Sequence, residues 1–251
     1  MLRLTAVRQR TESLVTPLEI EDYCIQASEF VSPPKWHLAH TTWFFETFIL
    51  IPFSSNYRIF DSSFAHLFNS YYETAGTFFP RPQRGLLSRP TVANIYRYRQ
   101  HVDEALGNFL TNLPQQLSQE VLVRVELGIE HEIQHQELLL MDIKYNFFIN
   151  PLYPIYQKLP KSLNSTSSTK TWHDFSGGLI ENGHNETTFC FDNERPKHQV
   201  FLRNFRLSSH LVTNEEYQHF IDDDGYQRAD LWLSDGWQII NKQGWKAPLY
   251  W

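Results

Sequence analysis

The chain has 251 residues, enough for one large domain or two of modest size, and its net charge of −6 gives no general electrostatic case for a nucleic acid or an anionic membrane as partner. Hydrophobic residues make up 41% of the chain and aromatic residues 15%, which excludes a disordered polypeptide and leaves ample material for a packed core. Only two cysteines occur, Cys24 and Cys190, so a metal ion would have to be held by histidines and carboxylates.

The N-terminal part of the chain has a helical pattern. Residues 1–14 lack the apolar core of a signal peptide, so we expect a cytoplasmic protein. The segment 33–51 begins with two prolines suited to a first helical turn and is expected to end at Pro52. Its apolar stretch is interrupted by Glu46 and is shorter than the roughly 20 residues of a membrane helix, so we expect no membrane partner. Its large aromatic residues are expected in the core: Trp36, Trp43, Phe44 and Phe45.

Two longer helices follow. Thr91 is placed to cap a helix over 92–110. Another helix covers about 118–148, where Gly128 disfavours the helix by roughly 1 kcal/mol against alanine without outweighing so long a pattern. Together with the N-terminal segment these make about four helices, which predicts a helical bundle over residues 1–157.

The pattern changes after a polar stretch, 158–172, which has few large side chains and is expected to be a linker. The glycine turns and short alternating runs in FSGGLIENGH and HQVFLRNFRLSSH predict strands, and NEEYQHFI predicts a short helix. So short a region supplies a small core, and we therefore expect 173–251 to be only part of a domain. The sequence thus predicts an α+β chain with a helical domain followed by a partial mixed domain.

The most informative string is HEIQHQE, residues 131–137. His131 and His135 stand at i and i+4, about 40° apart in helical projection, so both imidazoles could reach one ion. Glu137 falls on a different face and suits a hydrogen-bonding partner of a ligand better than a third ligand. The string is not the HExxH of zinc proteases: Glu132 is present, but a glutamate beside a histidine is common in solvent-facing helices. On spacing alone, two ordinary surface or half-buried histidines explain this string better than a metal site does.

A third ligand would have to come from another helix. The string WHLAH offers His37 and His40, and spacing does not choose between them. A hydrogen-bonded core histidine is the simpler interpretation of either one. Three histidines would hold Fe(II), Zn(II) or Ni(II) and leave coordination positions open.

Several motifs in register resemble one known family. WHLAHTTWFFETFIL, FNSYYETAG, RPQRGLLSRPT and HEIQHQELLLMDIK together resemble the N-terminal domain of the ergothioneine-biosynthesis sulfoxide synthases, the EgtB family. GGLIENGH, FDNERPKH and LVTNEEYQHFI resemble the start of the second domain of the same enzymes. The resemblance covers nearly the whole chain in the family's order. It implies an N-terminal DinB-like four-helix bundle followed by a truncated C-type-lectin-like domain with the fold of formylglycine-generating enzymes.

The resemblance also implies a chemistry. Members of the family use Fe(II) and O2 to join cysteine or γ-glutamylcysteine to hercynine, and they release a sulfoxide. The family's histidine pattern maps onto His40, His131 and His135 as metal ligands, and so selects His40 over His37. Complete relatives continue beyond the point where this chain stops. We therefore expect a fragment of a longer protein, a split protein whose partner chain supplies the rest of the second domain, or an inactive remnant.

The same resemblance assigns further residues. Arg81 and Arg84 would bind the carboxylate of the thiol substrate through their planar guanidinium groups, although a solvated basic turn explains the loop equally well. Gln134 would lie near the imidazole of hercynine; without the resemblance it is an exposed helix glutamine. Tyr71 and Tyr72 would donate a proton or hydrogen atom near the iron, although paired tyrosines are more often packing residues.

Two other functions stay open. DinB-like bundles include thiol transferases with a divalent metal on three histidines, and the motifs of residues 173–251 argue against that class. The other alternative is a non-catalytic metal-binding or interaction module that needs a partner to complete its fold.

Overall fold

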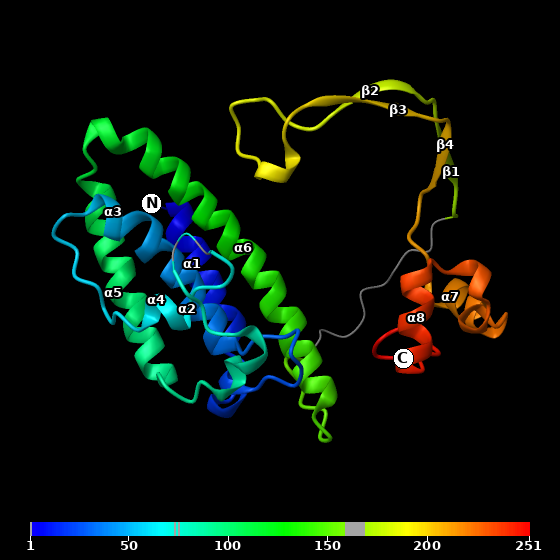
Figure 1. The fold of residues 1–251 in the computed structure, drawn as a ribbon, viewed down its shortest axis with the longest axis horizontal. Coiled ribbons are helices and arrows are strands. Elements are labelled where there is room, and N and C mark those ends of the chain that lie inside the picture. The colour runs from blue at the N-terminus through cyan, green and yellow to red at the C-terminus, as the bar shows by residue number, and fades with distance from the viewer. Residues whose placement is uncertain (1, 73, 75, 159–168) are drawn as a thin grey trace. The chain divides into compact units, whose positions relative to one another are not determined.

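The computed structural model describes residues 2–72, 74, 76–158 and 169–251 (Figure 1). The chain forms two compact units, Met1–Leu159 and Pro160–Trp251, and each is described by itself. Residues 159–168, which make up most of the predicted linker, lie outside the described residues. No helix in the described part of the chain is both long enough and apolar enough to cross a bilayer.

The first unit is built on long helices that pack against one another. Helix α2 contacts α1, α5 and α6, and α1 contacts α6. Two short helices, α3 and α4, connect α2 to α5 (Figure 1). The predicted helical bundle is confirmed. The bounds of its helices are α1 Leu2–Val15, α2 Pro34–Phe45, α3 Ile51–Phe53, α4 Phe64–Leu67, α5 Val92–Thr111 and α6 Ser118–Ile149.

Helix α2 begins as predicted, with Pro34 in its first turn, but the helical stretch that it opens continues past Pro52. A π-helical turn, Glu46–Leu50, follows α2 and leads directly into α3, which contains Pro52. In the π turn the N–H of Ile51 donates to the carbonyl of Glu46. This shifted register places the proline early in the next turn, where the missing N–H breaks no bond. The expectation that the helix stops at Pro52 is therefore wrong.

The other two predicted helices are confirmed, and the structure explains why α6 contains a glycine. The hydroxyl of Thr91 accepts a hydrogen bond from the backbone N–H of Asn94 at 3.2 Å and so caps α5. In α6, a Cβ added to Gly128 would lie 2.5 Å from a ring carbon of Phe45 and 3.1 Å from one of Phe44. The glycine that disfavours the helix locally thus allows α6 to approach α2.

The core of the first unit is rich in aromatic side chains. The side chains expected to be buried, Trp36, Trp43, Phe44 and Phe45, are all in the core. Polar groups are buried with them: the carboxylate of Glu46 accepts hydrogen bonds from the hydroxyls of Tyr57 and Tyr98, each at 2.5 Å. The core therefore holds this carboxyl group between two fixed hydrogen-bond donors.

The second unit contains paired strands and two helices. Strand β1 (Trp172–Phe175) pairs antiparallel with β4 (Phe205–Ser208), and β2 (Gly178–Asn182) pairs antiparallel with β3 (His198–Leu202). Helix α7 (Asn214–Asp222) begins at a capping box formed by Thr213 and Glu216, and α8 (Ser234–Gln243) follows. The predicted strands and short helix are confirmed, and the chain is α+β. Ile240 is the one buried apolar side chain among the described residues of this unit.

Candidate metal centre

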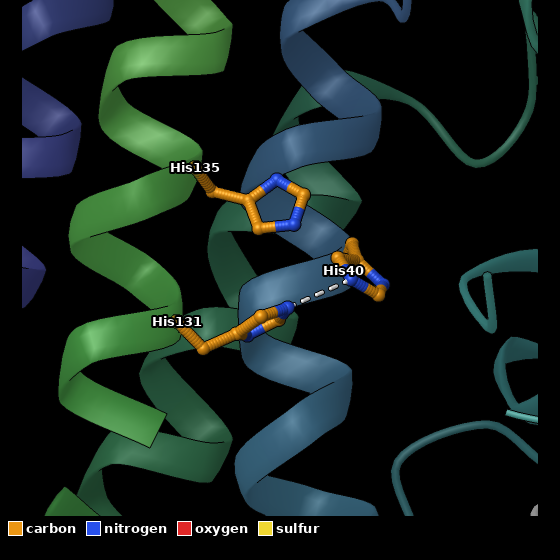
Figure 2. Close-up of side chains that lie close together, drawn as sticks. All are labelled: His40, His131 and His135. Carbon is orange, nitrogen blue, oxygen red and sulfur yellow. Dashed lines mark hydrogen bonds between the residues drawn. The ribbon is translucent and has the colours of Figure 1, made fainter. Parts of the chain in front are cut away.

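Helices α2 and α6 bring three histidines together in the first unit. His40 comes from α2, and His131 and His135 come from successive turns of α6 (Figure 2). Each residue offers one candidate ligand atom, and these atoms all lie within 4.8 Å of one another. The ring centroids of His131 and His135 are 4.6 Å apart, and that of His40 lies 4.7 Å from His135 and 5.0 Å from His131.

The protonation of these rings suits metal binding. The Nδ1–H of His40 donates to the carbonyl of Phe68 at 2.6 Å, which leaves Nε2 as the bare nitrogen, 3.2 Å from Nε2 of His131. Burial lowers the pKa of His131 to about 4. Burial, together with the neighbouring histidines, holds the pKa values of His40 and His135 well below the usual range. The three imidazoles are therefore neutral at pH 7, and protons do not compete for their lone pairs.

The arrangement fits a divalent transition metal. Nitrogen donors of borderline softness are the ligands that Fe(II), Zn(II) and Ni(II) prefer. Nδ1 of His131 is also buried without a hydrogen-bond partner among the described residues, so no hydrogen bond of this nitrogen fixes the tautomer of the ring. A metal ion on the histidines would fix the orientation of that ring.

His37 lies beside this group without offering it a nitrogen. Its Nδ1 is 2.9 Å from Nδ1 of His135, and its Nε2 is 2.9 Å from a carboxylate oxygen of Asp142. Both ring nitrogens are thus engaged. Of the two histidines that spacing left open, the geometry favours His40 as the ligand.

A cavity of about 360 Å³ opens in front of the histidines. Its wall includes all of the site residues predicted from the sequence. Among them, Gln134 is an exposed residue of α6 that borders the cavity. The lining residues are Ser32, Trp36, His37, His40, Ser70, Tyr71, Tyr72, Arg81, Arg84, His131, Gln134, His135, Leu138 and Asp142.

The two predicted arginines give one wall of the cavity a positive charge. Arg84 is only 3% exposed, and its guanidinium donates to the hydroxyls of Ser32 at 2.9 Å and Ser70 at 3.4 Å. Burial and the nearby charge of Arg81 lower the pKa of Arg84 to about 10, so it stays charged at pH 7. The Nε atoms of both arginines are buried without a partner in the described part of the chain. Such a wall suits a carboxylate ligand.

Trp36 connects this arginine to the metal centre. The guanidinium of Arg84 lies 3.4 Å from the centroid of the Trp36 ring, and Trp36 stacks on His40 at 4.5 Å with an interplanar angle of 12°. Trp43 stacks on His40 at 5.5 Å and 14°. The candidate ligand His40 is therefore held by two buried indoles, and one of them also supports Arg84.

The two tyrosines have different surroundings. Tyr72 is half-buried against the rings of Trp43, Phe44 and Phe48, and burial raises its pKa, so its hydroxyl keeps its proton. Tyr71 is 66% exposed and packs edge-on against Phe78. Both border the cavity, but only Tyr72 has a ring fixed by the core.

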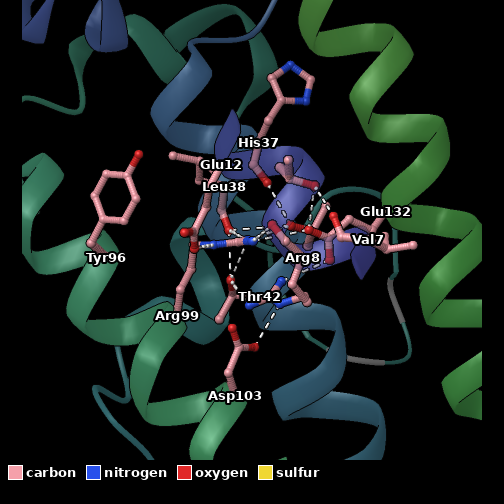
Figure 3. A network of polar contacts seen from close by, with 12 residues as sticks. Val7, Arg8, Glu12, His37, Leu38, Thr42, Tyr96, Arg99, Asp103 and Glu132 are labelled. Carbon is pink, nitrogen blue, oxygen red and sulfur yellow. Dashed lines mark hydrogen bonds and ion pairs between the residues drawn. The ribbon is translucent and has the colours of Figure 1, made fainter. Parts of the chain in front are cut away.

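The interpretation of the two glutamates beside the histidines is corrected. Glu132 is fully buried and accepts hydrogen bonds from Arg8 at 2.9 Å and Arg99 at 3.2 Å (Figure 3). Burial alone would raise the pKa of Glu132, but the two arginines overcome that effect and lower it to about 2. Glu137 is exposed and has no hydrogen-bond partner among the residues described, so it does not support a ligand.

Sequence reasoning also missed Asp142, whose carboxylate accepts a hydrogen bond from His37 and not from one of the three candidate ligands. A signal for Glu132 was present in the chain: it lies seven residues after Val125 and seven before Leu139, on the buried stripe of α6. Asp142 follows His135 by the same interval of seven residues. The interval of seven residues was thus a weak signal for both carboxylates, which the charge of the side chains outweighed.

The matched families cover the two units in order. A model described as the DinB superfamily matches residues 3–139, which is more than half of the chain. A model described as a sulfatase-modifying factor enzyme 1-like domain matches residues 160–249.

Three proteins of similar sequence are named as hercynine oxygenases or as an ergothioneine biosynthesis protein. The chain is 29% identical over 250 residues to the hercynine oxygenase of Mycobacterium tuberculosis, covering 99% of this chain and 56% of that protein. It is 34% identical over 130 residues to the hercynine oxygenase of Mycolicibacterium smegmatis, and the match covers 51% of this chain and 30% of that protein. It is 25% identical over 148 residues to ergothioneine biosynthesis protein 1 of Neurospora crassa, and the match covers 53% of this chain and 16% of that protein. The chain therefore spans about half the length, or less, of these relatives.

Proposed function

The chain belongs to the DinB superfamily and to the EgtB family, and from this premise we propose that it is an oxidative enzyme of ergothioneine biosynthesis, or the metal-binding part of one. The observation that carries the proposal is the convergence of His40, His131 and His135 at a cavity whose wall also holds two arginines. A neutral histidine set beside a cationic wall suits a redox metal and an anionic substrate together.

The proposed reaction joins cysteine or γ-glutamylcysteine to hercynine and yields a sulfoxide, with O2 as the oxidant. Fe(II), when bound by the three histidines, would supply the oxygen chemistry and open positions for reactants. The protein side chains would orient the substrates around it, because positioned reactants lose less entropy on reaction. As the chain spans about half the length of its relatives, the activity and substrates of the whole protein are part of this proposal.

Each lining residue has a stated part in the proposal. Arg81 and Arg84 would bind the carboxylate of the thiol substrate, whose negative charge would also reduce the repulsion between the two guanidinium groups. Gln134 would hydrogen-bond the imidazole of hercynine. Tyr72, whose hydroxyl keeps its proton, would be the proton donor; Tyr71 would close the exposed side of the cavity.

Iron binding is the first test of the proposal. The chain is reconstituted anaerobically with Fe(II), desalted and analysed for iron. We expect one iron per chain, and we expect His131→Ala and His135→Ala to lose it, because two imidazoles hold a labile ion weakly. The matched control is His101→Ala, since His101 is a half-buried histidine of α5 that lies outside the cavity lining and donates to the carbonyl of Arg58. Equal iron content in all variants would refute the ligand assignment.

Turnover is the second test. The iron-loaded chain is supplied with hercynine, O2 and either thiol, alone and with the part of a relative that this chain does not match added in trans, and sulfoxide is measured by mass spectrometry. Sulfoxide formation supports the oxidative enzyme. A transferred thiol without oxidation would instead indicate the DinB-like thiol transferase. Iron binding without either product under both conditions would indicate a metal-binding module.

A further inference from the structure

A second buried polar chain runs behind the candidate metal centre. Nδ1 of His135 lies 2.9 Å from Nδ1 of His37, and Nε2 of His37 lies 2.9 Å from Oδ2 of Asp142. His37 and Asp142 are 2% and 7% exposed, so both lie out of bulk solvent. The same Oδ2 accepts the backbone N–H of Ser32 at 2.8 Å, which fixes the carboxylate in place.

The two helices bring these groups together by their spacing. His135 and Asp142 are two turns apart on one face of α6, and His37 is one turn before His40 on α2. The geometry that places His40 at the candidate metal centre therefore also places His37 behind His135.

The direction of the hydrogen bonds follows from what each atom can do. A carboxylate only accepts, so Nε2 of His37 carries the proton that points to Asp142. A neutral His37 then has a bare Nδ1, which can only accept a hydrogen bond, and its donor is the Nδ1–H of His135. A neutral His135 with its proton on Nδ1 has a bare Nε2, the nitrogen turned toward the other two histidines (Figure 2).

We propose that Asp142 and His37 are positioning residues that hold His135 in the tautomer with a bare Nε2, ready to bind a metal ion. The inference rests on the proposed function, because it takes His135 as a ligand. The carbonyl of Phe68 performs the same task for His40 directly. For His135 the acceptor is another histidine, so the tautomer depends on a carboxylate one residue further away.

The first experiment reads the tautomers without any metal. Long-range ¹H–¹⁵N correlation spectra of the metal-free chain distinguish protonated from bare ring nitrogens. We expect His135 with its proton on Nδ1 and His37 with its proton on Nε2. In His37→Phe, Nδ1 of His135 loses its acceptor. We then expect the proton of His135 on Nε2, or a mixture of the two neutral tautomers. An unchanged His135 in that variant would overturn the proposal.

The second experiment measures affinity with Co(II), whose visible absorption reports ligand number. Removing a group that orients a ligand typically weakens metal binding by about 10–100-fold. We expect that loss for His37→Phe and for Asp142→Ala, and we expect Asp142→Asn to restore much of the affinity, because an amide oxygen can still accept from His37. If Asp142 had only a structural role, Asp142→Asn would not restore the Co(II) affinity.

Asn146 supplies the matched control. It is buried one turn after Asp142 on α6, and its side chain also ties the segment before α2 to α6, through the N–H of Ala27 and the carbonyl of Ile25. Asn146→Ala should leave Co(II) affinity and the tautomer of His135 unchanged. Equal losses in Asp142→Ala and Asn146→Ala would reduce Asp142 to a structural residue and overturn the inference.

The two proposals fail separately. Expected tautomers and Co(II) losses without any sulfoxide product would refute the proposed enzyme and keep the positioning role. Sulfoxide production by the wild-type chain, together with an unchanged Co(II) affinity in His37→Phe, would support the proposed enzyme and refute the positioning role. If Asp142→Ala does not fold, His37→Phe and Asp142→Asn still decide the question.

Discussion

At the residue scale, Glu132 shows what one buried charge does when its partners are fixed. Its carboxylate lies between Arg8 and Arg99, and it also accepts from the hydroxyl of Thr11 at 2.7 Å. Arg8 in turn pairs with Asp103 at 2.7 Å, so the network connects α1, α5 and α6. Removing the central carboxylate would take the fully buried counter-ion from Arg8 and Arg99 and leave them only their more exposed partners, Asp103 and Glu12.

Glu132→Ala should therefore lower the free energy of unfolding of the first unit by about 3–5 kcal/mol. Urea unfolding followed by circular dichroism would measure this loss. Glu137→Ala is the matched control: it removes an exposed glutamate from the same helix and should change stability by less than about 0.5 kcal/mol. Similar values for the two variants would mean that the arginines find other partners.

Arg84 is the residue at which substrate recognition can be separated from metal binding. Arg84→Lys keeps the charge but loses the planar group that lies over Trp36 and the geometry that suits a carboxylate. Losing one charged hydrogen bond of about 1.5–3 kcal/mol would raise the KM for the thiol substrate about 10–100-fold. The iron content should not change. Arg89→Lys, in the same loop but exposed, should alter neither quantity, and an iron loss in Arg84→Lys would indicate a structural role.

Residue-level prediction from the sequence reached the helix spacing of His131 and His135 but could not choose between His37 and His40. That choice needed the family's pattern, because both histidines lie on α2 among aromatic residues and three positions apart. Only three-dimensional contacts showed that His37 has both nitrogens engaged. Glu132 and Asp142 were missed for a related reason, since a charged residue on a helix is interpreted as exposed unless its partners on other helices are known.

At the element scale, the close approach of α2 and α6 explains both the core and the site. Gly128 faces the rings of Phe44 and Phe45, three residues before His131. Helix propensity alone predicts that alanine at this position is stabilising by roughly 1 kcal/mol. A Cβ at this position would lie 2.5 Å from a ring carbon of Phe45. This contact reverses the expectation, because moving an aromatic ring in a packed core costs free energy.

Gly128→Ala should consequently destabilise the first unit, by about 1–3 kcal/mol. The double variant Gly128→Ala with Phe45→Leu tests the cause, because leucine lacks the ring carbons that the new methyl group would meet. The loss in the double variant should be smaller than the sum of the two single losses. Additive losses would show that the strain lies elsewhere.

The π turn after α2 makes the bundle sensitive to alkaline pH. Glu46 in this turn accepts from the hydroxyl of Tyr98 on α5, and burial together with that carboxylate raises the pKa of Tyr98 well above its ordinary value of 10.0. A folded pKa above the unfolded one means that Tyr98 contributes stability below pH 10, which is lost as the pH rises beyond it. The expected slope is about 1.4 kcal/mol per pH unit for one fully differing proton.

Unfolding free energies measured between pH 8 and pH 11 by urea titration would show this loss. Tyr98→Phe should be less stable at pH 8, because Glu46 loses a donor, and should have a shallower alkaline slope. An identical slope in the variant would assign the alkaline loss to another group.

At the scale of the whole molecule, the two units differ in how much apolar surface they bury. The hydrophobic core cluster contains residues of the first unit alone, and among the described residues of the second unit only Ile240 is a buried apolar side chain. Large apolar residues of its strands are exposed, including Leu179 at 65% and Phe201 at 71%. The general pattern of strands, turns and helices was predictable here because capping and alternation are local, and the shortness of the region already indicated a small core.

Hydrogen exchange should register this difference. Backbone amides of β1–β4 should exchange faster than those of α2, α5 and α6, because few packed side chains oppose local opening in the second unit. Mass spectrometry of peptides after timed deuterium labelling would compare the two units in one sample. Comparable protection in both would show that the second unit is stabilised by contacts other than burial.

The sequence separation of the three candidate ligands has a kinetic consequence. His131 and His135 share α6, but His40 stands 91 positions before His131, so the full set exists only once α2 has docked on α6. An ion that needs all three rings cannot guide the early steps of folding and is captured by the assembled bundle. Saturation at about 100 times Kd would then stabilise the native state by about 2.7 kcal/mol. Because that gain is absent until docking is complete, loading should mainly slow unfolding, and folding should proceed at the rate of the empty chain.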